Sequence, residues 1–327
     1  MRVTVLGAGS WGTALALHLG RAGHDVVLWS RDPEVAAHIQ STRRHPRRFL
    51  ETALPDAVRG TSDLSEALAY AETALVAVPC ASFRALFESM PAKVTASRYV
   101  SVAKGIEPET LLRMTEIILA YRPDASVAAL SGPTFAEGVA RGDPTAAVIA
   151  DAGGNLAREL QGQFSDGRLR LYSSDDLVGV ELAGALKNVV AIAAGVVAGL
   201  GFGPNTIAAL VTRGLAELGR IVRARGGQAR TIAGLAGVGD LLLTCTGRES
   251  RNRRLGEEIG RGGRLSEILL EMPEVAEGAR TCLAVPRMAA EAGMESPIAD
   301  AVVQVLYENV PPADAVSRLM TRTLRSE

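Results

Sequence analysis

Residues 3–12 read VTVLGAGSWG, and this stretch decides the fold. The apolar run 3–6 predicts a buried strand, and Gly7, Gly9 and Gly12 form a GxGxxG turn before a helical pattern. Gly7 allows the tight turn, Gly9 lets a pyrophosphate approach the backbone, and Gly12 lets the helix pack on the sheet. The helix start at Ser10 and Trp11 offers free amides to phosphates. We therefore predict a dinucleotide site; the alternative is a glycine turn that only links strand to helix.

Outward from this turn, short apolar runs alternate with helical patterns over the first half of the chain, which predicts a doubly wound parallel sheet of the Rossmann type. The expected strands are Val3–Leu6, Val26–Trp29, Thr73–Val78, Tyr99–Val102, Val127–Leu130, Thr145–Ile149 and Leu169–Tyr172. The expected helices include Trp11–Ala22, Val35–Gln40, Ser65–Tyr70, Ser82–Ser89 and Glu109–Leu119.

Strand signals stop after about residue 174, and the remainder reads as helices separated by glycine clusters. The expected fold is therefore α/β, with an N-terminal doubly wound parallel sheet followed by an all-α C-terminal domain. We place the boundary near 175–185, which gives a dinucleotide-binding domain at 1–180 and a helical substrate-binding and catalytic domain at 181–327.

Composition excludes several classes of protein. The 327 residues are 47% hydrophobic and 22% charged with a net charge of −1, as in a folded globular chain without a polycationic surface for nucleic acid. The three cysteines are widely spaced, so neither a disulfide framework nor a zinc ribbon is expected, no metal is assigned, and a cytoplasmic location fits. No signal peptide is recognised at the start.

The stretch 188–212 carries no charge and is long enough to span a membrane. It is rich in Ala, Val and Gly, however, and Gly201, Gly203 and Pro204 interrupt it. We therefore expect a buried helix that breaks near Gly201 and restarts after Pro204, and no membrane span.

The tip of the second expected strand bears on the choice of nicotinamide cofactor. An acid there would bind a ribose 2′-hydroxyl, whereas Ser30-Arg31 offers a guanidinium that suits a 2′-phosphate. We predict that NADP(H) is bound, with NAD(H) as the other possible cofactor; Arg31 could alternatively be a solvated surface arginine. Asp32 is expected to start the next helix, with Pro33 in its first turn.

The second half of the chain places polar groups inside apolar sequence. Lys187 and Asn188 interrupt a helix that is otherwise apolar, and a buried ammonium needs an anion or a cavity. An ion pair with Glu181 is the structural alternative, although a spacing of six places the two residues on different helix faces. Asp240 follows Gly237 and Gly239, where it could either be a functional residue or cap the start of a helix.

Arginines concentrate in residues 248–254, which read RESRNRR. Together with Ser250 and Asn252 at an expected helix start, they suit a phosphate group. Arg248 and Arg254 are expected to be part of a solvated face.

These motifs combine into a resemblance that covers nearly the whole chain. GAGSWGTALA, SVAKGIE, SGPTFAEGVA, GVELAGALKNVVAIAAG, AGVGDLLLTCTGRESRNRRLG and VAEGARTC resemble the NAD(P)-dependent glycerol-3-phosphate dehydrogenases of the bacterial type. The resemblance implies hydride transfer between a nicotinamide and C2 of the substrate pair dihydroxyacetone phosphate and sn-glycerol 3-phosphate, for phospholipid synthesis.

The resemblance also implies roles for individual residues. Lys187 of ALKN would be the acid/base, Lys104 of SVAKG would contact substrate and cofactor, and Asp240 would orient substrate or Lys187. For the substrate it implies Gly132, Thr134, Ser250, Arg251 and Asn252. For the cofactor it implies Trp11, Ala136, Arg251, Val275 and Glu277.

Three of these segments have purely structural alternatives. Lys104 could be a surface lysine, Gly132 could belong to a glycine-proline turn, and Val275 and Glu277 could lie in a loop before a helix. Residues 43–48, which are rich in arginine, depart from the family pattern and receive no role. Other hydroxyacid dehydrogenases, such as a 6-phosphogluconate or 3-hydroxyacid enzyme, and a redox-sensing NADP(H)-binding protein are the competing hypotheses. A homodimer is an open possibility.

Overall fold

The computed structural model describes residues 1–272 and 276–324. The chain divides into two compact units. Unit 1 comprises Met1–Ala103 and Arg113–Glu181, and unit 2 comprises Lys104–Leu112 and the chain from Leu182 on. The segment Lys104–Leu112 therefore belongs to unit 2, although its neighbours on both sides in the sequence belong to unit 1.

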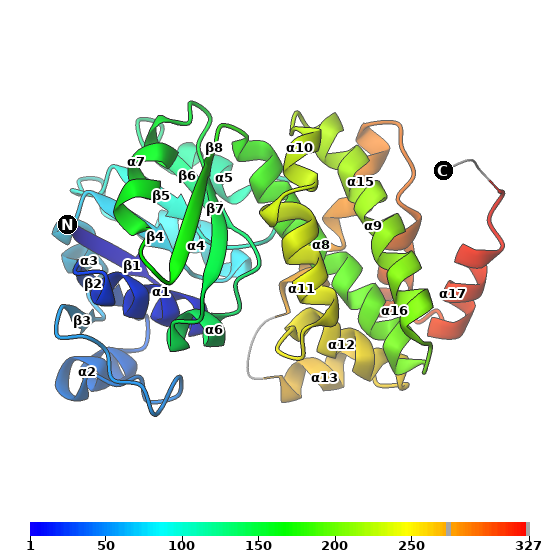
Figure 1. The fold of residues 1–327 in the computed structure, drawn as a ribbon, viewed down its shortest axis with the longest axis horizontal. Helices are drawn as coiled ribbons and strands as arrows, with labels where there is room; N and C mark the ends of the chain where they lie inside the picture. Colours follow the sequence, from blue (N-terminus) through cyan, green and yellow to red (C-terminus); the bar gives the residue numbers. More distant parts are fainter. Residues whose placement is uncertain (273–275, 325–327) are drawn as a thin grey trace. The chain divides into compact units, whose positions relative to one another are not determined.

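Unit 1 is built on one eight-stranded sheet in the order β3-β2-β1-β4-β5-β6-β7-β8 (Figure 1). The six strands from β3 to β6 are parallel and follow the strand order of dinucleotide-binding folds. The strands are β1 Arg2–Leu6, β2 Asp25–Trp29, β3 Val58–Thr61, β4 Thr73–Val76, β5 Arg98–Ser101, β6 Ser126–Ser131, β7 Thr145–Ala150 and β8 Leu169–Ser174.

The expected parallel sheet is confirmed for six of the seven strand pairings, and the exception is β7, which runs antiparallel to β6. The connecting helix α6, Ala136–Arg141, has six residues and is about 9 Å long, whereas six-residue β6 spans about 20 Å. After this short helix β7 returns in the opposite direction. β8 then pairs parallel to β7.

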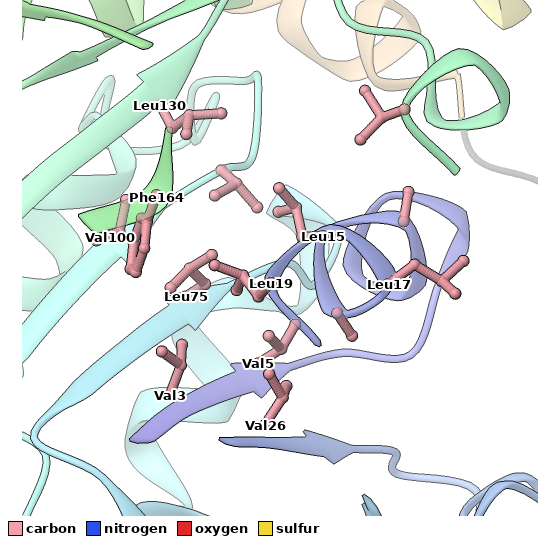
Figure 2. Close-up of a cluster of buried hydrophobic side chains, with 14 of the residues drawn as sticks. Val3, Val5, Leu15, Leu17, Leu19, Val26, Leu75, Val100, Leu130 and Phe164 are labelled. Carbon is pink, nitrogen blue, oxygen red and sulfur yellow. The ribbon is translucent and has the colours of Figure 1, made fainter. Parts of the chain in front are cut away.

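Helices cover both faces of the sheet. Successive strand residues point to opposite faces, so Val3 and Val5 join the cluster around α1 (Figure 2), while Thr4 donates a hydrogen bond to the carbonyl of Ala67 in α3. The helices of unit 1 are α1 Ser10–Arg21, α2 Pro33–Thr42, α3 Leu64–Tyr70, α4 Phe83–Glu88, α5 Met114–Tyr121, α6 Ala136–Arg141 and α7 Asn155–Phe164, with a short 3-10 turn, η1, at Cys80–Ser82.

Seven of the strands lie where the sequence predicts them, within a few residues at each end. β3 was not expected; its VRGT sequence contains a charge and a glycine, and it lies at the sheet edge. The helix expected at Glu109–Leu119 begins only at Met114, where Glu116 accepts a hydrogen bond from the Arg113 amide. The residues before it belong to unit 2.

The second half of the chain is helical, as expected. Its elements are α8 Leu177–Gly199, α9 Pro204–Ala224, α10 Ala229–Ile232, η2 Leu235–Gly239, α11 Asp240–Thr246, α12 Arg251–Gly260, α13 Leu265–Glu271, α14 Glu277–Thr281, α15 Ala284–Glu291, α16 Pro297–Tyr307 and α17 Pro312–Met320. The predicted break near Gly201 and restart at Pro204 are confirmed by the ends of α8 and α9. Among the described residues, α8 alone has the length and hydropathy of a membrane span, and 89% of its apolar window is buried within the protein.

Candidate active site

The glycine turn has the geometry that its spacing predicts. Gly7 has φ +116°, and a Cβ there would lie 2.9 Å from the backbone of Ala77. A Cβ on Gly12 would lie 1.9 Å from the carbonyl oxygen of Gly7, so only glycine lets α1 pack this closely. By contrast, apart from the neighbours of Gly9 in the chain, no atom of the described residues lies within 4 Å of a Cβ built there, which leaves this side of the turn open to a ligand.

The start of α1 fits a bound anion. Its N-cap residue is Gly9, which has no side chain to accept hydrogen bonds from the first amides, and the first turn holds no acid. The indole Nε1 of Trp11 is buried and makes no hydrogen bond with the described residues. A pyrophosphate at this helix start could accept hydrogen bonds from the first amides of the helix and from Trp11 Nε1.

Basic side chains gather at the tip of β2. Asp32 caps α2 by accepting hydrogen bonds from the amides of Glu34 and Val35, as the sequence predicts, and it also pairs with Arg47 at 3.0 Å. Its carboxylate is therefore already engaged. Arg31 beside it is exposed and makes no ion pair or hydrogen bond to the residues that the structure describes.

His45 ties residues 43–48 to the glycine turn. Its Nδ1 accepts a hydrogen bond from the Arg47 amide at 3.1 Å, so Nε2 carries the proton and donates to the Ala8 carbonyl at 2.9 Å. The ring is 4% exposed, and its burial lowers the pKa of His45, which favours the neutral form. These residues depart from the family pattern, and nothing in the local sequence distinguishes the histidine.

The SGPTFA segment follows β6 directly. Gly132 has φ +147°, and a Cβ there would lie 2.9 Å from Ala147 Cα. The amide and hydroxyl of Thr134 both donate to the Gly132 carbonyl, at 2.8 and 3.2 Å, and Ala136 opens α6. The segment is thus a tight turn at the carboxyl end of a strand, which is where open α/β sheets place their ligands.

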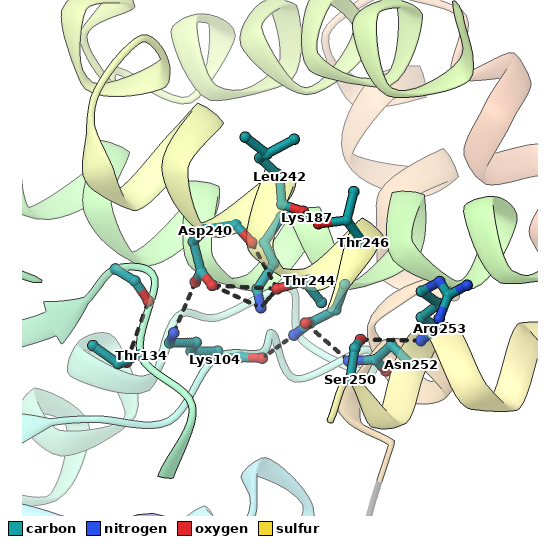
Figure 3. A network of polar contacts seen from close by, with 12 residues as sticks. Lys104, Thr134, Lys187, Asp240, Leu242, Thr244, Thr246, Ser250, Asn252 and Arg253 are labelled. Atoms are coloured by element: carbon teal, nitrogen blue, oxygen red, sulfur yellow. Dashed lines mark hydrogen bonds and ion pairs between the residues drawn. The ribbon is translucent and has the colours of Figure 1, made fainter. Parts of the chain in front are cut away.

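In unit 2, two lysines share one carboxylate (Figure 3). Asp240 Oδ2 lies 2.7 Å from Lys104 Nζ, and Oδ1 lies 3.1 Å from Lys187 Nζ. The side chains of Asp240 and Lys187 are 2% and 7% exposed, and that of Lys104 is 16% exposed. The alternatives of a surface lysine at 104 and a Lys187–Glu181 ion pair are therefore wrong; Glu181 pairs with Arg113 instead.

Asp240 is not a helix N-cap either, because Gly239 takes that position in α11. It is the first residue of α11, and the backbone before it is the helical turn η2. Thr244, one turn later on the same face, accepts a hydrogen bond from Lys187 Nζ at 2.6 Å and donates to the Asp240 carbonyl at 2.6 Å. Thr244 was missed from the sequence, although its spacing of four from Asp240 is a usable signal.

Burial controls the protonation of Lys187. Desolvation lowers the pKa of Lys187 to about 8, with a further lowering from the Lys104 charge and an opposing effect from Asp240. Such a group exchanges protons readily near neutral pH, which suits an acid/base role. Its protonated form has three hydrogens, of which Asp240 and Thr244 take two.

The arginine-rich motif forms the start of α12. Ser250 is its N-cap and accepts from the Arg253 amide at 3.2 Å, and Arg251 is its exposed first residue. Arg253 pairs with Glu257 at 2.6 Å, while Arg248 and Arg254 are exposed as expected.

Asn252 is buried and already bonded on both sides of its amide. It donates to Asn188 and accepts from the Gly278 amide. Glu277, the neighbour of Gly278, opens α14, and Val275 lies outside the described residues.

Both halves of the chain match known proteins. Residues 2–157 match the model for the N-terminus of NAD-dependent glycerol-3-phosphate dehydrogenase, and residues 176–317 match the model for its C-terminus. Glycerol-3-phosphate dehydrogenase (NAD(P)+) of Koribacter versatilis is 47% identical over 100% of this chain and 98% of its own length. The first of two Salinibacter ruber proteins with this name is 45% identical, over 99% of this chain and 96% of its own.

A solved structure agrees. The crystal structure of glycerol-3-phosphate dehydrogenase from Coxiella burnetii is 36% identical and covers 98% of this chain and 99% of its own, with a TM-score of 0.92. The glycine turn, the lysine pair on one carboxylate and the matches along both halves lead to one conclusion. This chain belongs to the family of NAD(P)-dependent glycerol-3-phosphate dehydrogenases.

Proposed function

We propose that this chain interconverts dihydroxyacetone phosphate and sn-glycerol 3-phosphate with NAD(P)H as the hydride donor, in the direction that supplies glycerophospholipid synthesis. The observation that carries the proposal is the buried carboxylate of Asp240 between Lys104 and Lys187, because it holds an acid/base group ready beside a second cation. In this proposal unit 1 binds the dinucleotide, and unit 2 binds the substrate and supplies the acid/base. Apart from Lys104–Leu112, which belong to unit 2, we set the division between these roles at residues 180 and 181.

The proposed chemistry pairs a hydride with a proton. The bound cofactor supplies the hydride that reaches C2 of the substrate. Protonated Lys187 donates its remaining N–H to the C2 oxygen as negative charge develops there, and it becomes neutral as the alcohol forms. In the oxidative direction neutral Lys187 accepts the same proton. Asp240 keeps Lys187 oriented, and Lys104 adds positive charge for the substrate oxygens.

The substrate phosphate is assigned to the start of α12. Arg251 offers a guanidinium, Ser250 closes the helix start, and Asn252 keeps one amide hydrogen beyond its bond to Asn188. Amides in the first turn of a ten-residue helix favour an anion as well. On this basis Arg251→Ala chiefly raises the KM for dihydroxyacetone phosphate. Gly132 and Thr134 are proposed as further substrate contacts.

The phosphates of the cofactor are assigned to residues of unit 1. Gly7, Gly9, Ser10, Trp11 and Gly12 would hold the pyrophosphate, and Arg31 would hold an adenosine 2′-phosphate. Engagement of Asp32 with Arg47 and with the α2 amides supports NADP(H), since this acid is then poorly placed to accept from a ribose 2′-hydroxyl. Ala136, Glu277, Lys104 and Arg251 remain proposed contacts from the family resemblance, as does Val275.

Three broader proposals complete the assignment. The chain works in the cytoplasm, which the three free cysteines support. It binds no nucleic acid, which the net charge of −1 supports. It forms a homodimer, supported by exposed apolar side chains in unit 2 such as Phe202 and Leu242, at 46% and 56% exposure; sedimentation at several concentrations tests this.

One assay tests the function directly. Purified protein is mixed with dihydroxyacetone phosphate and either NADPH or NADH, and loss of the reduced-nicotinamide absorbance is followed. Turnover with at least one cofactor is expected. Absence of turnover with both, from protein that melts cooperatively, contradicts the assignment and favours a binding protein or another hydroxyacid substrate. 6-Phosphogluconate and 3-hydroxyacids with NAD(P)+ are then the next substrates.

A further inference from the structure

A line of hydrogen bonds crosses unit 2 and ends on the main chain of Lys104. The Gly278 amide donates to Asn252 Oδ1 at 2.9 Å, Asn252 Nδ2 donates to Asn188 Oδ1 at 2.9 Å, and Asn188 Nδ2 donates to the Lys104 carbonyl at 3.0 Å. A main-chain amide can only donate and a carbonyl can only accept, so the two ends fix the orientation of both side-chain amides. Turning over either amide breaks two bonds at once.

Close packing of α8 and α12 holds the two asparagines together. A Cβ on Gly195 of α8 would lie 2.0 Å from the Arg253 carbonyl oxygen, and a Cβ on Gly256 of α12 would lie 2.1 Å from that of Ile192. Gly199 and Gly260 continue the same contact one turn later. The two helices therefore touch backbone to backbone, and this contact brings Asn188 and Asn252 together.

The far end of the line is packed just as tightly. A Cβ on Gly278 would lie 2.7 Å from the Asn188 carbonyl oxygen and 2.8 Å from Asn252 Oδ1. Both asparagines are also buried, at 3% and 8% exposure. Water therefore competes poorly for these bonds, and an unmade bond would leave a polar group without a partner.

Lys104, at the other end of this line of hydrogen bonds, lies in a segment without regular secondary structure. Lys104 begins the segment Lys104–Leu112, which contains no helix of its own. Its side chain is held by Asp240 and its carbonyl by Asn188, so one residue is fixed at two points. Arg287, which donates to the Pro108 carbonyl, secures the same segment further along.

We propose that Asn188 and Asn252, with the amide of Gly278, are positioning residues that fix the main chain at Lys104 and thereby keep its ammonium on Asp240 beside Lys187. The inference rests on the proposed function for its effect on catalysis, and on the geometry alone for its effect on the lysines. This positioning role is separate from the substrate contact that we propose for Asn252.

The composition of the chain permits a direct test. Lys104 and Lys187 are two of only three lysines, and the third, Lys93, is exposed. In protein labelled with carbon-13 at lysine Cε, NMR therefore follows the titration of each ammonium without any turnover. Asn188→Ala removes the bond to Lys104, and Gly278→Ala breaks the far end without changing a charge or touching either lysine.

The expected result has two parts. The Lys187 titration moves to higher pH in Asn188→Ala, because a released Lys104 ammonium no longer opposes protonation of Lys187. The kcat falls by up to about 100-fold, the order of loss that a misplaced catalytic group produces. Gly278→Ala also moves the Lys187 titration to higher pH and lowers kcat, each by a smaller amount.

Gly219→Ala, at a glycine inside α9 whose Cβ would meet nothing closer than 3.6 Å, is the matched control and leaves both quantities unchanged. A folded Asn188→Ala or Gly278→Ala protein with the wild-type Lys187 titration and kcat overturns the proposal. Should Asn188→Ala fail to fold, Gly278→Ala decides. Lack of turnover by the wild type would refute the proposed function, and the NMR titration would still decide whether the asparagines position Lys104.

Discussion

Lys187 Nζ lies 3.1 Å from Oδ1 of Asp240, and both side chains are almost completely buried. Because Asp240 holds Lys104 with its other oxygen, one carboxylate serves two ammonium groups. A single carboxylate leaves this cluster with a net positive charge when both lysines are protonated. Such a cluster suits a substrate that brings its own negative charge and develops more at C2 during reduction.

Replacing Lys187 by alanine removes the proposed proton donor. We expect kcat for dihydroxyacetone phosphate reduction to fall by about 10²–10⁴-fold, the usual range for an acid/base group. Cofactor binding, measured by fluorescence titration with NADPH, should be retained because Lys187 is not among the proposed cofactor contacts. Lys93→Ala, at an exposed lysine, is the control. Retention of full activity in Lys187→Ala would remove the central residue from the mechanism.

The pH dependence follows from the lowered pKa of Lys187. The neutral amine is the base for oxidation, so kcat/KM for glycerol 3-phosphate should rise through about pH 8 and then level off. The protonated form is the acid for reduction, so kcat/KM for dihydroxyacetone phosphate should decline over the same range.

Asp240→Asn tests whether Lys187 sets the pH midpoint of these kcat/KM profiles. Asp240 raises the pKa of Lys187, so loss of its charge should move the midpoint to lower pH. The variant is also expected to be less stable, since two buried cations lose their partner. An unchanged midpoint in folded Asp240→Asn would mean that another group controls the profile.

Arg31→Ala addresses the choice of cofactor. A charge-assisted contact to a 2′-phosphate contributes about 1.5–3 kcal/mol, which corresponds to roughly a 10- to 150-fold rise in KM for NADPH. The KM for NADH should change less than about twofold. Because Arg31 is exposed and makes no ion pair with the described residues, the melting temperature should stay constant. Equal losses with both cofactors would refute the proposed contact.

Local sequence patterns predict much of this fold. The glycine turn at 7–12 and seven apolar runs predict the positions of the strands, because a strand covered on both faces must be apolar at nearly every residue. The polar pair Lys187-Asn188 also stands out, since polar groups are costly inside an apolar helix. Local sequence therefore makes Lys187 and Asp240 candidates, whereas Lys104 becomes one only through the family resemblance.

Other features depend on contacts between distant segments. β3 has too little apolar sequence to be recognised, and its pairing with β2 alone makes it a strand. The antiparallel direction of β7 is a property of its pairing with β6, and the apolar runs that predict the strands carry no information about direction. Glycine spacing on α8 and α12 likewise becomes informative only when each helix is known to be the other's neighbour. The bond from Asn188 to the Lys104 carbonyl joins residues 84 positions apart, so local sequence could not predict it.

The glycine contact between α8 and α12 yields a prediction about stability. Gly256→Ala places a Cβ 2.1 Å from the Ile192 carbonyl oxygen, so the helices must separate. Overpacking of this kind typically costs about 1–3 kcal/mol, and more where two backbones collide. For a unit of this size each 1 kcal/mol lowers the melting temperature by roughly 2–4 °C.

Gly219→Ala serves as the comparison, because it adds the same methyl group where space allows it and where alanine is the better helix former by about 0.5–1 kcal/mol. Calorimetry should therefore show opposite signs for the two variants. Gly256 lies one turn beyond Asn252 on α12, so Gly256→Ala should also displace that amide and lower kcat. A Gly256→Ala protein as stable and as active as the wild type would show that the helices yield without moving the asparagines.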